Sequence, residues 1–166
     1  MGLPGNGGFV DYIIRRLKQN EVSILDTFLY EAIFVPEGAD APPHEIIEQP
    51  ELQVYVAGFG RKKSDLCYVA EVDGKIAGAA WVRIMDDYGH IDDETPSFAI
   101  SCLKEYRNCG IGTKLMKQML LTLREQGYRQ ASLSVQKENY AVRLYEKVGF
   151  QIVDENVEEY IMVCRL

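Results

Sequence analysis

The chain has 166 residues, of which 47% are hydrophobic and 26% are charged. This length and composition are those of a single globular domain and exclude a disordered, collagen-like or coiled-coil chain. The formal charge of −7, from 25 acidic and 18 basic residues, opposes binding to nucleic acid or to an anionic membrane surface, so neither is expected as a partner.

Targeting signals and metal motifs are not apparent in the sequence. The octet Met1–Gly8 is rich in glycine, is expected to be frayed, and has no basic start followed by an apolar run. No apolar segment approaches the ~20 residues of a membrane-spanning helix. The four cysteines form no C-x-x-C pair, so the sequence predicts free thiols, no metal site and a cytoplasmic location.

The first half of the chain is expected to hold a strand over 9–17, a helix over 22–33, and short helical stretches near 44–48 and 51–58. Apolar residues recur at steps of three and four in the helical segment, which lines one face of a helix. Four prolines interrupt 34–65, where we expect irregular structure that lines a pocket.

The second half alternates strands with helices. The helix over 111–126 has the clearest amphipathic spacing and is closed by Gly127, and Asn139 caps a short helix over 140–148. Expected strands cover 66–72, 75–84, 97–103, 131–135, 150–153 and 160–165. Asp73-Gly74 between the first two predicts a hairpin. The strand–helix–strand unit that follows implies a parallel pair with a right-handed crossover.

Two glycines lie where the strand over 97–103 gives way to the long helix, in Arg107-Asn108-Cys109-Gly110-Ile111-Gly112-Thr113. Glycines let backbone amides point outward, and the helix start adds the positive end of its dipole, so the segment suits a phosphate. Taken alone, it is equally typical of a plain strand-to-helix turn. It lacks the Gly-Lys-Ser/Thr of a Walker A loop and the third glycine or alanine of a dinucleotide-binding fingerprint.

A second stretch makes the first more specific. Asn139-Tyr140-Ala141-Val142-Arg143-Leu144-Tyr145-Glu146-Lys147-Val148-Gly149-Phe150, read with Arg107-x-x-Gly110-x-Gly112, resembles the GNAT superfamily of acetyl-CoA-dependent N-acetyltransferases. The likeness extends from Val69 to the C-terminus. It implies one domain over 1–166 with an α/β (α+β) fold: a mixed, largely antiparallel sheet of about seven strands, with a splayed parallel pair (strands 4 and 5) and flanking helices.

The resemblance also implies residues that contact coenzyme A, namely Ile100, Cys102, Arg107, Asn108, Gly110, Gly112, Thr113, Asn139 and Tyr145. Backbone amides from Arg107 to Thr113 would hold the pyrophosphate. Ile100 and Cys102 would pair with the pantetheine arm, with Asn139 beside it.

Tyr145 would lie near the thioester sulfur and protonate the leaving thiolate, a role that a phenol can fill as general acid. A core aromatic is the structural alternative for this residue. Cys102 near the thioester raises a covalent route, but no histidine stands at a readable distance to activate it, and a small core residue is the better interpretation.

The general base is less well defined. Glu94, in Asp92-Asp93-Glu94-Thr95 before the fourth strand, is the candidate, and His90 is its rival. A solvated acidic turn, which could also attract a cationic substrate, is the third interpretation.

The sequence therefore predicts an N-acetyltransferase that moves an acetyl group from acetyl-CoA to a primary amine of a small molecule or peptide by direct attack, without a metal. The alternative is a non-catalytic domain that binds or senses acyl-CoA. The acidic composition favours an amine acceptor over an anionic one, and the sequence leaves homodimer formation open.

Overall fold

The structure is a computed structural model that describes residues 10–166, so the N-terminal octet lies outside the described residues. One sheet of seven strands has the order β1-β2-β3-β4-β5-β7-β6. The strands are β1 (Ile13–Arg16), β2 (Leu66–Val72), β3 (Lys75–Arg83), β4 (Ser97–Cys102), β5 (Gln130–Gln136), β6 (Phe150–Glu155) and β7 (Glu159–Arg165). Every neighbouring pair is antiparallel except β4 and β5, which confirms the expected mixed sheet.

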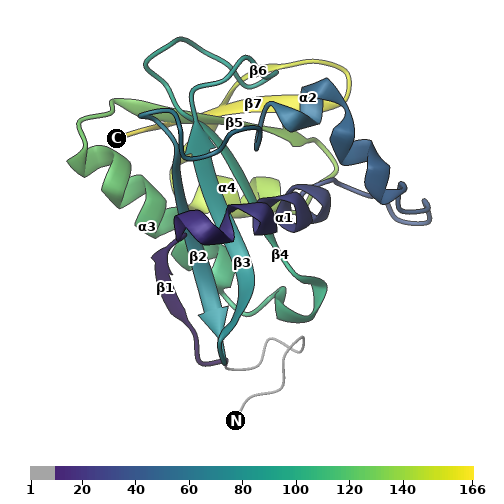
Figure 1. Ribbon diagram of the computed structural model, residues 1–166. Helices are drawn as coiled ribbons and strands as arrows, with labels where there is room; N and C mark the ends of the chain where they lie inside the picture. Colours follow the sequence, from purple (N-terminus) through teal and green to yellow (C-terminus); the bar gives the residue numbers. More distant parts are fainter. Residues whose placement is uncertain (1–9) are drawn as a thin grey trace.

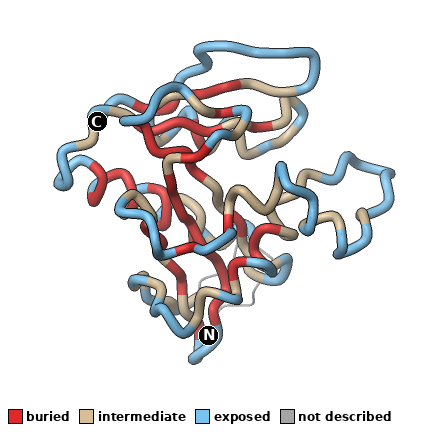
Figure 2. The backbone as a smooth tube through the Cα atoms, turned by 45° about the horizontal axis from the view of Figure 1, so that its top comes forward, coloured by how far each residue is buried: buried red, intermediate tan, exposed pale blue. Residues whose placement is uncertain are grey.

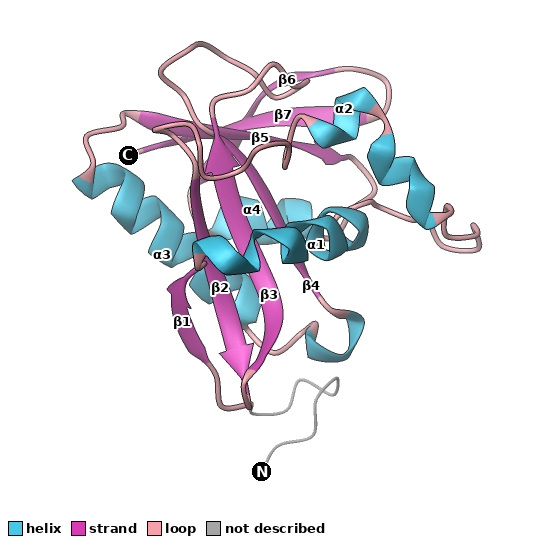
Figure 3. Ribbon diagram, in the orientation of Figure 1, coloured by secondary structure: helices cyan, strands magenta, loops and turns pink. Residues whose placement is uncertain are grey.

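The helices follow the expected order (Figure 3). They are the 3-10 helices η1 (Gln19–Ile24), η2 (His44–Glu48) and η3 (Lys104–Tyr106), and the α-helices α1 (Leu25–Glu31), α2 (Pro50–Gln53), α3 (Ile111–Glu125) and α4 (Ala141–Lys147). The single helix expected over 22–33 is wrong in its first turns. There the chain forms the tighter 3-10 helix η1 before α1 begins. The Glu21 carboxylate in η1 accepts hydrogen bonds from the Lys18 amide, at 2.8 Å, and from the Arg15 side chain.

Helices cover both faces of the sheet (Figure 1). On one face, α3 and Tyr145 of α4 pack on side chains such as Leu133 and Phe98. On the other face, α1 packs Leu25 and Phe28 against Trp81 of β3. Figure 2 shows that the buried segments follow the central strands, whereas the loops are exposed. No helix within residues 10–166 is long and apolar enough to cross a bilayer.

The parallel pair is joined at a single position. Ser97 of β4 pairs with Ser132 of β5, whose amide donates to the Pro96 carbonyl at 2.9 Å. Beyond that point the two strands separate, and in Figure 1 β5 lies across the top of the sheet while β4 runs down it. The expected splay of strands 4 and 5 is therefore confirmed, and it leaves one edge of β4 open.

Candidate active site

A cleft of about 970 Å³ lies between the C-terminal half of β4, the start of α3, α4, and the loop that follows α1. It contains nine residues that the sequence singled out: Ile100, Cys102, Arg107, Asn108, Gly110, Gly112, Thr113, Asn139 and Tyr145. Residues from strands and helices far apart in the chain thus meet around one space. That space has the size of a small-molecule or cofactor site.

The start of α3 presents free amides to this cleft. Gly110 has a φ of 81° and Asn108 a φ of 62°, so the chain passes twice through the left-handed region before the helix begins. The first helical hydrogen bond runs from the Lys114 amide to the Gly110 carbonyl, and no side chain within residues 10–166 caps the amides of the first turn. The first turn also holds no acidic residue. These donors and the helix dipole together attract an anionic group.

The backbone amide and the side chain of Arg107 both make hydrogen bonds within the protein. Its amide already donates to the Lys104 carbonyl at 3.3 Å, so the free amides begin after it. Its guanidinium donates to the Cys102 carbonyl at 3.1 Å and to the Glu31 carboxylate at 3.0 Å. The side chain therefore ties the loop before α3 to the ends of β4 and α1. Glu31 was not anticipated, because no local pattern links two residues so far apart in sequence.

The open edge of β4 presents backbone groups to the cleft. The Leu103 amide donates a hydrogen bond to the Ala77 carbonyl of β3. Because the backbone N–H and C=O groups of successive residues point to alternate sides of a strand, the backbone groups of Cys102 and Ile100 face away from β3. An extended chain could pair with Ile100 there, as the resemblance implies. Burial raises the pKa of the Cys102 thiol to about 11, which keeps it protonated at neutral pH and disfavours its use as a nucleophile.

Tyr145 projects from α4 into the same cleft. Its ring packs at a tilt against Phe150 with 6.1 Å between centroids, and the residue is only 8% exposed. Its hydroxyl makes no hydrogen bond within residues 10–166. Every fully buried side-chain polar atom in that range has a hydrogen-bond partner, so the Tyr145 hydroxyl is not fully buried and opens to the cleft. Burial and, less strongly, Cys102 raise the pKa of Tyr145, which keeps its proton in place through neutral pH.

Asn139 is occupied in part by local structure. Its side-chain oxygen accepts a hydrogen bond at 2.9 Å from the amide of Ala141, the first residue of α4, while the N-cap position itself is Tyr140. Its amide NH₂ and the second lone pair of that oxygen are left for a ligand. The resemblance implies the pattern Asn-x-x-Ala, but only Tyr140 separates Asn139 from Ala141, so this asparagine lies one residue closer to the alanine.

The structure does not bring Glu94 to Tyr145. Glu94 is exposed in the loop before β4 and does not line the cleft. The side chain of its neighbour Asp92 accepts from the Glu94 amide at 2.8 Å and from Thr95, which is typical of a solvated turn. The His90 ring contacts the Met85 carbonyl at 2.9 Å and also lies outside the cleft.

Comparison with known proteins agrees with this geometry. The acetyltransferase (GNAT) family profile matches residues 29–150. The chain is 40% identical over 62 residues to a [ribosomal protein bS18]-alanine N-acetyltransferase of Haemophilus influenzae, which is 37% of this chain and 42% of that protein. It is 32% identical over 95 residues to an N-alpha-acetyltransferase of Sulfurisphaera tokodaii, which is 52% of this chain and 56% of that protein. The matches thus span about half of these relatives or less.

Solved structures show the same fold. The PaiA N-acetyltransferase of Thermoplasma acidophilum, solved in complex with coenzyme A, superposes with a TM-score of 0.70 at 17% identity over 95% of this chain and 100% of that one. An acetyltransferase of the GNAT family from Streptococcus pneumoniae superposes with a TM-score of 0.68 at 22% identity over 94% and 100% of the two chains. With the family profile matching most of its length, the chain belongs to the acetyltransferase (GNAT) family.

Proposed function

We propose that this chain is an N-acetyltransferase that transfers the acetyl group of acetyl-CoA to a primary amine by direct attack. The observation that carries the proposal is that one cleft contains both the uncapped amides at the start of α3 and the buried Tyr145. The Tyr145 hydroxyl has no hydrogen-bond partner among the described residues. The amides suit the diphosphate of coenzyme A, and the phenol suits the other end of the cosubstrate. Family membership and the N-acetyltransferase relatives support the same reading.

Each group has a defined part in this scheme. The amides of Gly110, Ile111, Gly112 and Thr113 hold the diphosphate, and the free backbone edge at Ile100 orients the pantetheine arm as an added strand. When the amine attacks the thioester carbonyl, the new C–N bond forms and the C–S bond breaks. Tyr145 then gives its proton to the departing thiolate, and the proton lost by the amide nitrogen restores the phenol.

A non-catalytic domain that binds or senses acyl-CoA is the competing function. Such a domain would need the uncapped amides but would have no use for a hydroxyl that faces the cleft without a partner. The geometry of Tyr145 therefore favours the enzyme.

The experiment is a thermal shift with acetyl-CoA, followed by thiol-release assays over a panel of primary amines, with wild type compared to Tyr145→Phe. We expect both proteins to be stabilised by acetyl-CoA and only wild type to release coenzyme A rapidly. Stabilisation of wild type without turnover on any amine would favour the sensor.

A cytoplasmic location and a soluble amine acceptor complete the proposal. Both follow from the composition of the chain rather than from the site.

A further inference from the structure

The acetyl-transfer scheme leaves one question open, which is where the amine loses its proton. The candidate from the sequence, Glu94, is exposed to solvent in the loop before β4. The opposite face of the β4–β5 splay holds a different carboxylate.

Side-chain alternation separates the two faces at the splay. Phe98, Ile100 and Cys102 of β4 point toward α3 and α4, on the Tyr145 side. Ser101 points the other way and donates to the Phe28 carbonyl of α1. On β5, Leu133 and Val135 join the α3 side, so Ser132 and Ser134 lie on the α1 side.

Asp87 lies on the α1 side, at the point where β4 and β5 part. One carboxylate oxygen accepts from Ser97, the last β4 residue paired with β5, at 3.0 Å. The other accepts from the Tyr55 hydroxyl at 3.0 Å. A Cβ placed on Gly89 would lie 3.3 Å from that second oxygen and 3.2 Å from the Ser134 amide nitrogen, so the carboxylate is close to β5 just beyond the last pair.

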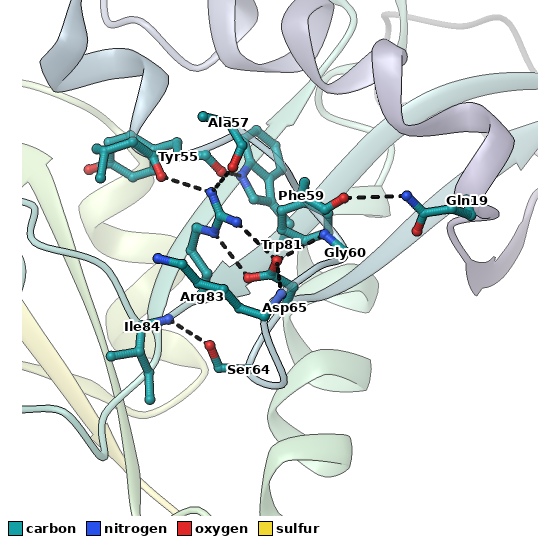
Figure 4. Close-up of polar contacts among 12 residues, drawn as sticks. Gln19, Tyr55, Ala57, Phe59, Gly60, Ser64, Asp65, Trp81, Arg83 and Ile84 are labelled. Carbon is teal, nitrogen blue, oxygen red and sulfur yellow. Dashed lines mark hydrogen bonds and ion pairs between the residues drawn. The ribbon is translucent and has the colours of Figure 1, made fainter.

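Two buried side chains of β3 fix the segment that carries Tyr55 (Figure 4). The Trp81 indole donates to the Tyr55 carbonyl at 3.1 Å, and Arg83 donates to the Val54 and Ala57 carbonyls at 3.1 and 2.9 Å. Arg83 is itself held by a bidentate pair with Asp65, at 3.0 and 2.9 Å. The Tyr55 hydroxyl, and through it Asp87, is thus positioned by the core.

Among residues 10–166, the charge of Asp87 has no partner of opposite sign. No ion pair within residues 10–166 includes Asp87 or its acidic neighbour Glu159 of β7, in contrast to Asp65. Asp87 and Glu159 therefore present negative charge where an ammonium group would neutralise it.

We propose that Asp87 binds the ammonium group of the acceptor and takes its proton, so that the amine reaches the thioester from the α1 face while Tyr145 acts from the other face. This inference rests on the proposed N-acetyltransferase function. The ammonium N–H bond breaks and its proton passes to an Asp87 oxygen, which leaves the lone pair that forms the C–N bond. Asp87 then returns that proton to water, and Tyr145 serves the thiolate as described above.

The surroundings of Asp87 suit a proton acceptor. Burial is the main cause that raises the pKa of Asp87 above its ordinary value, while the hydrogen bonds from Tyr55 and Ser97 lower it in part. Glu159, whose pKa burial also raises, faces it from β7, and His90 is the nearest basic residue of its own loop. Each carboxylate oxygen has a second lone pair, so both can accept from an ammonium group as well.

The test compares Asp87→Asn with wild type and with Glu94→Gln, the matched change at the exposed carboxylate of the same loop. The assay measures coenzyme A release from acetyl-CoA with spermidine, lysine and tripeptides that have free N-termini, as a function of pH, and thermal shifts with coenzyme A. We expect Asp87→Asn to bind coenzyme A as wild type does, to lose about a hundred-fold in kcat/KM, and to lose the acidic limb of the pH profile. Glu94→Gln should match wild type.

Tyr55→Phe provides a second test of Asp87 in case Asp87→Asn folds poorly. Removing the Tyr55 hydroxyl takes a hydrogen bond from the charged carboxylate, so the acidic limb should move to higher pH. An Asp87→Asn enzyme within about threefold of wild type, or a limb that neither variant changes, would overturn the assignment. If wild type releases no coenzyme A with any of these amines, the proposed function fails and this inference fails with it. If wild type is active and only the Asp87 prediction fails, the proposed function stands.

Discussion

The guanidinium of Arg107 donates to the carboxylate of Glu31 at 3.0 Å, although 76 residues separate them in sequence. This contact joins the loop that carries the uncapped amides of α3 to the end of α1, on the opposite side of the cleft. We propose that the Arg107 side chain links these two segments and is not a direct ligand of the cosubstrate.

If that proposal is correct, Arg107→Ala and Glu31→Gln should weaken coenzyme A binding by similar, several-fold factors, and the double variant should be no weaker than either. Stability should change by about 0–1 kcal/mol in each, because the Arg107 side chain is 44% exposed. Titration calorimetry measures the affinities. A far larger loss for Arg107→Ala alone would show that its side chain contacts the cosubstrate directly.

Gly112→Val should abolish coenzyme A binding while the protein stays folded. A Cβ at this glycine would meet only the Leu144 side chain at 3.5 Å, an ordinary contact, so the helix should accept it. The larger side chain would instead fill the space beside the free amides and block the approach of phosphate. Thermal melting with and without coenzyme A measures both the stability of the variant and its binding. A folded variant that keeps wild-type affinity would show that the amides at the start of α3 do not bind the diphosphate.

Tyr145→Phe should lower kcat by about 10²–10⁴-fold with little change in coenzyme A affinity, because the hydroxyl acts only on the leaving thiolate. Stability should stay within about 0.5 kcal/mol, since the hydroxyl has no hydrogen-bond partner among residues 10–166. Tyr140→Phe is the control at the edge of the same cleft, where the side chain is 86% exposed. Equal turnover by the two variants would remove Tyr145 from the mechanism.

Breaking the buried pair of Arg83 and Asp65 should cost far more stability than breaking an exposed ion pair. Their side chains are 2% and 0% exposed, and Asp65 also accepts from the Gly60 amide at 2.8 Å. Arg83→Met leaves that carboxylate without its cation and should cost about 3–5 kcal/mol in urea denaturation. Lys75→Met, at an ion pair whose side chains are 59% and 54% exposed, should cost less than about 1 kcal/mol. Similar costs for both variants would contradict this ranking.

Acid should weaken the fold at Glu21. A hydrogen bond from Arg15 is the main cause that lowers the pKa of Glu21 from 4.5 to about 2. A carboxyl whose pKa is lower in the folded than in the unfolded state stabilises the fold above the unfolded pKa and loses that contribution as the pH falls through the folded one. The stability advantage of wild type over Glu21→Gln should therefore shrink from pH 4.5 toward pH 2. A constant difference across that range, measured by chemical denaturation, would show that the pair has no effect.

Local chemistry explains what the sequence could predict. Asp73 and Gly74 have φ values of 50° and 80°, as a two-residue hairpin turn requires, and Gly127 with a φ of 89° ends α3 where expected. The amphipathic spacing of α3 and the glycines before it predict where the uncapped amides of this helix lie in the chain. Each of these signals lies within a few residues.

The features that were missed depend on contacts between distant segments. The carbonyls that Arg83 binds and the serine that holds Asp87 come from other parts of the chain, so no spacing in the sequence marks them. Its position just before β4 makes Glu94 a candidate base from sequence, but Glu94 is exposed, while Asp87, seven residues earlier in the same loop, accepts from Tyr55 and Ser97. Which carboxylate of a loop faces the splay is decided by packing against Tyr55 and Gly89, and periodicity carries no information about it.

The most direct measurement is a titration of ¹⁵N-labelled protein with coenzyme A, followed by the backbone amide resonances. We predict the largest shifts at Gly110, Ile111, Gly112 and Thr113, with smaller ones at Ile100 and Tyr145. Shifts confined to another surface, or no shifts at all, would contradict it.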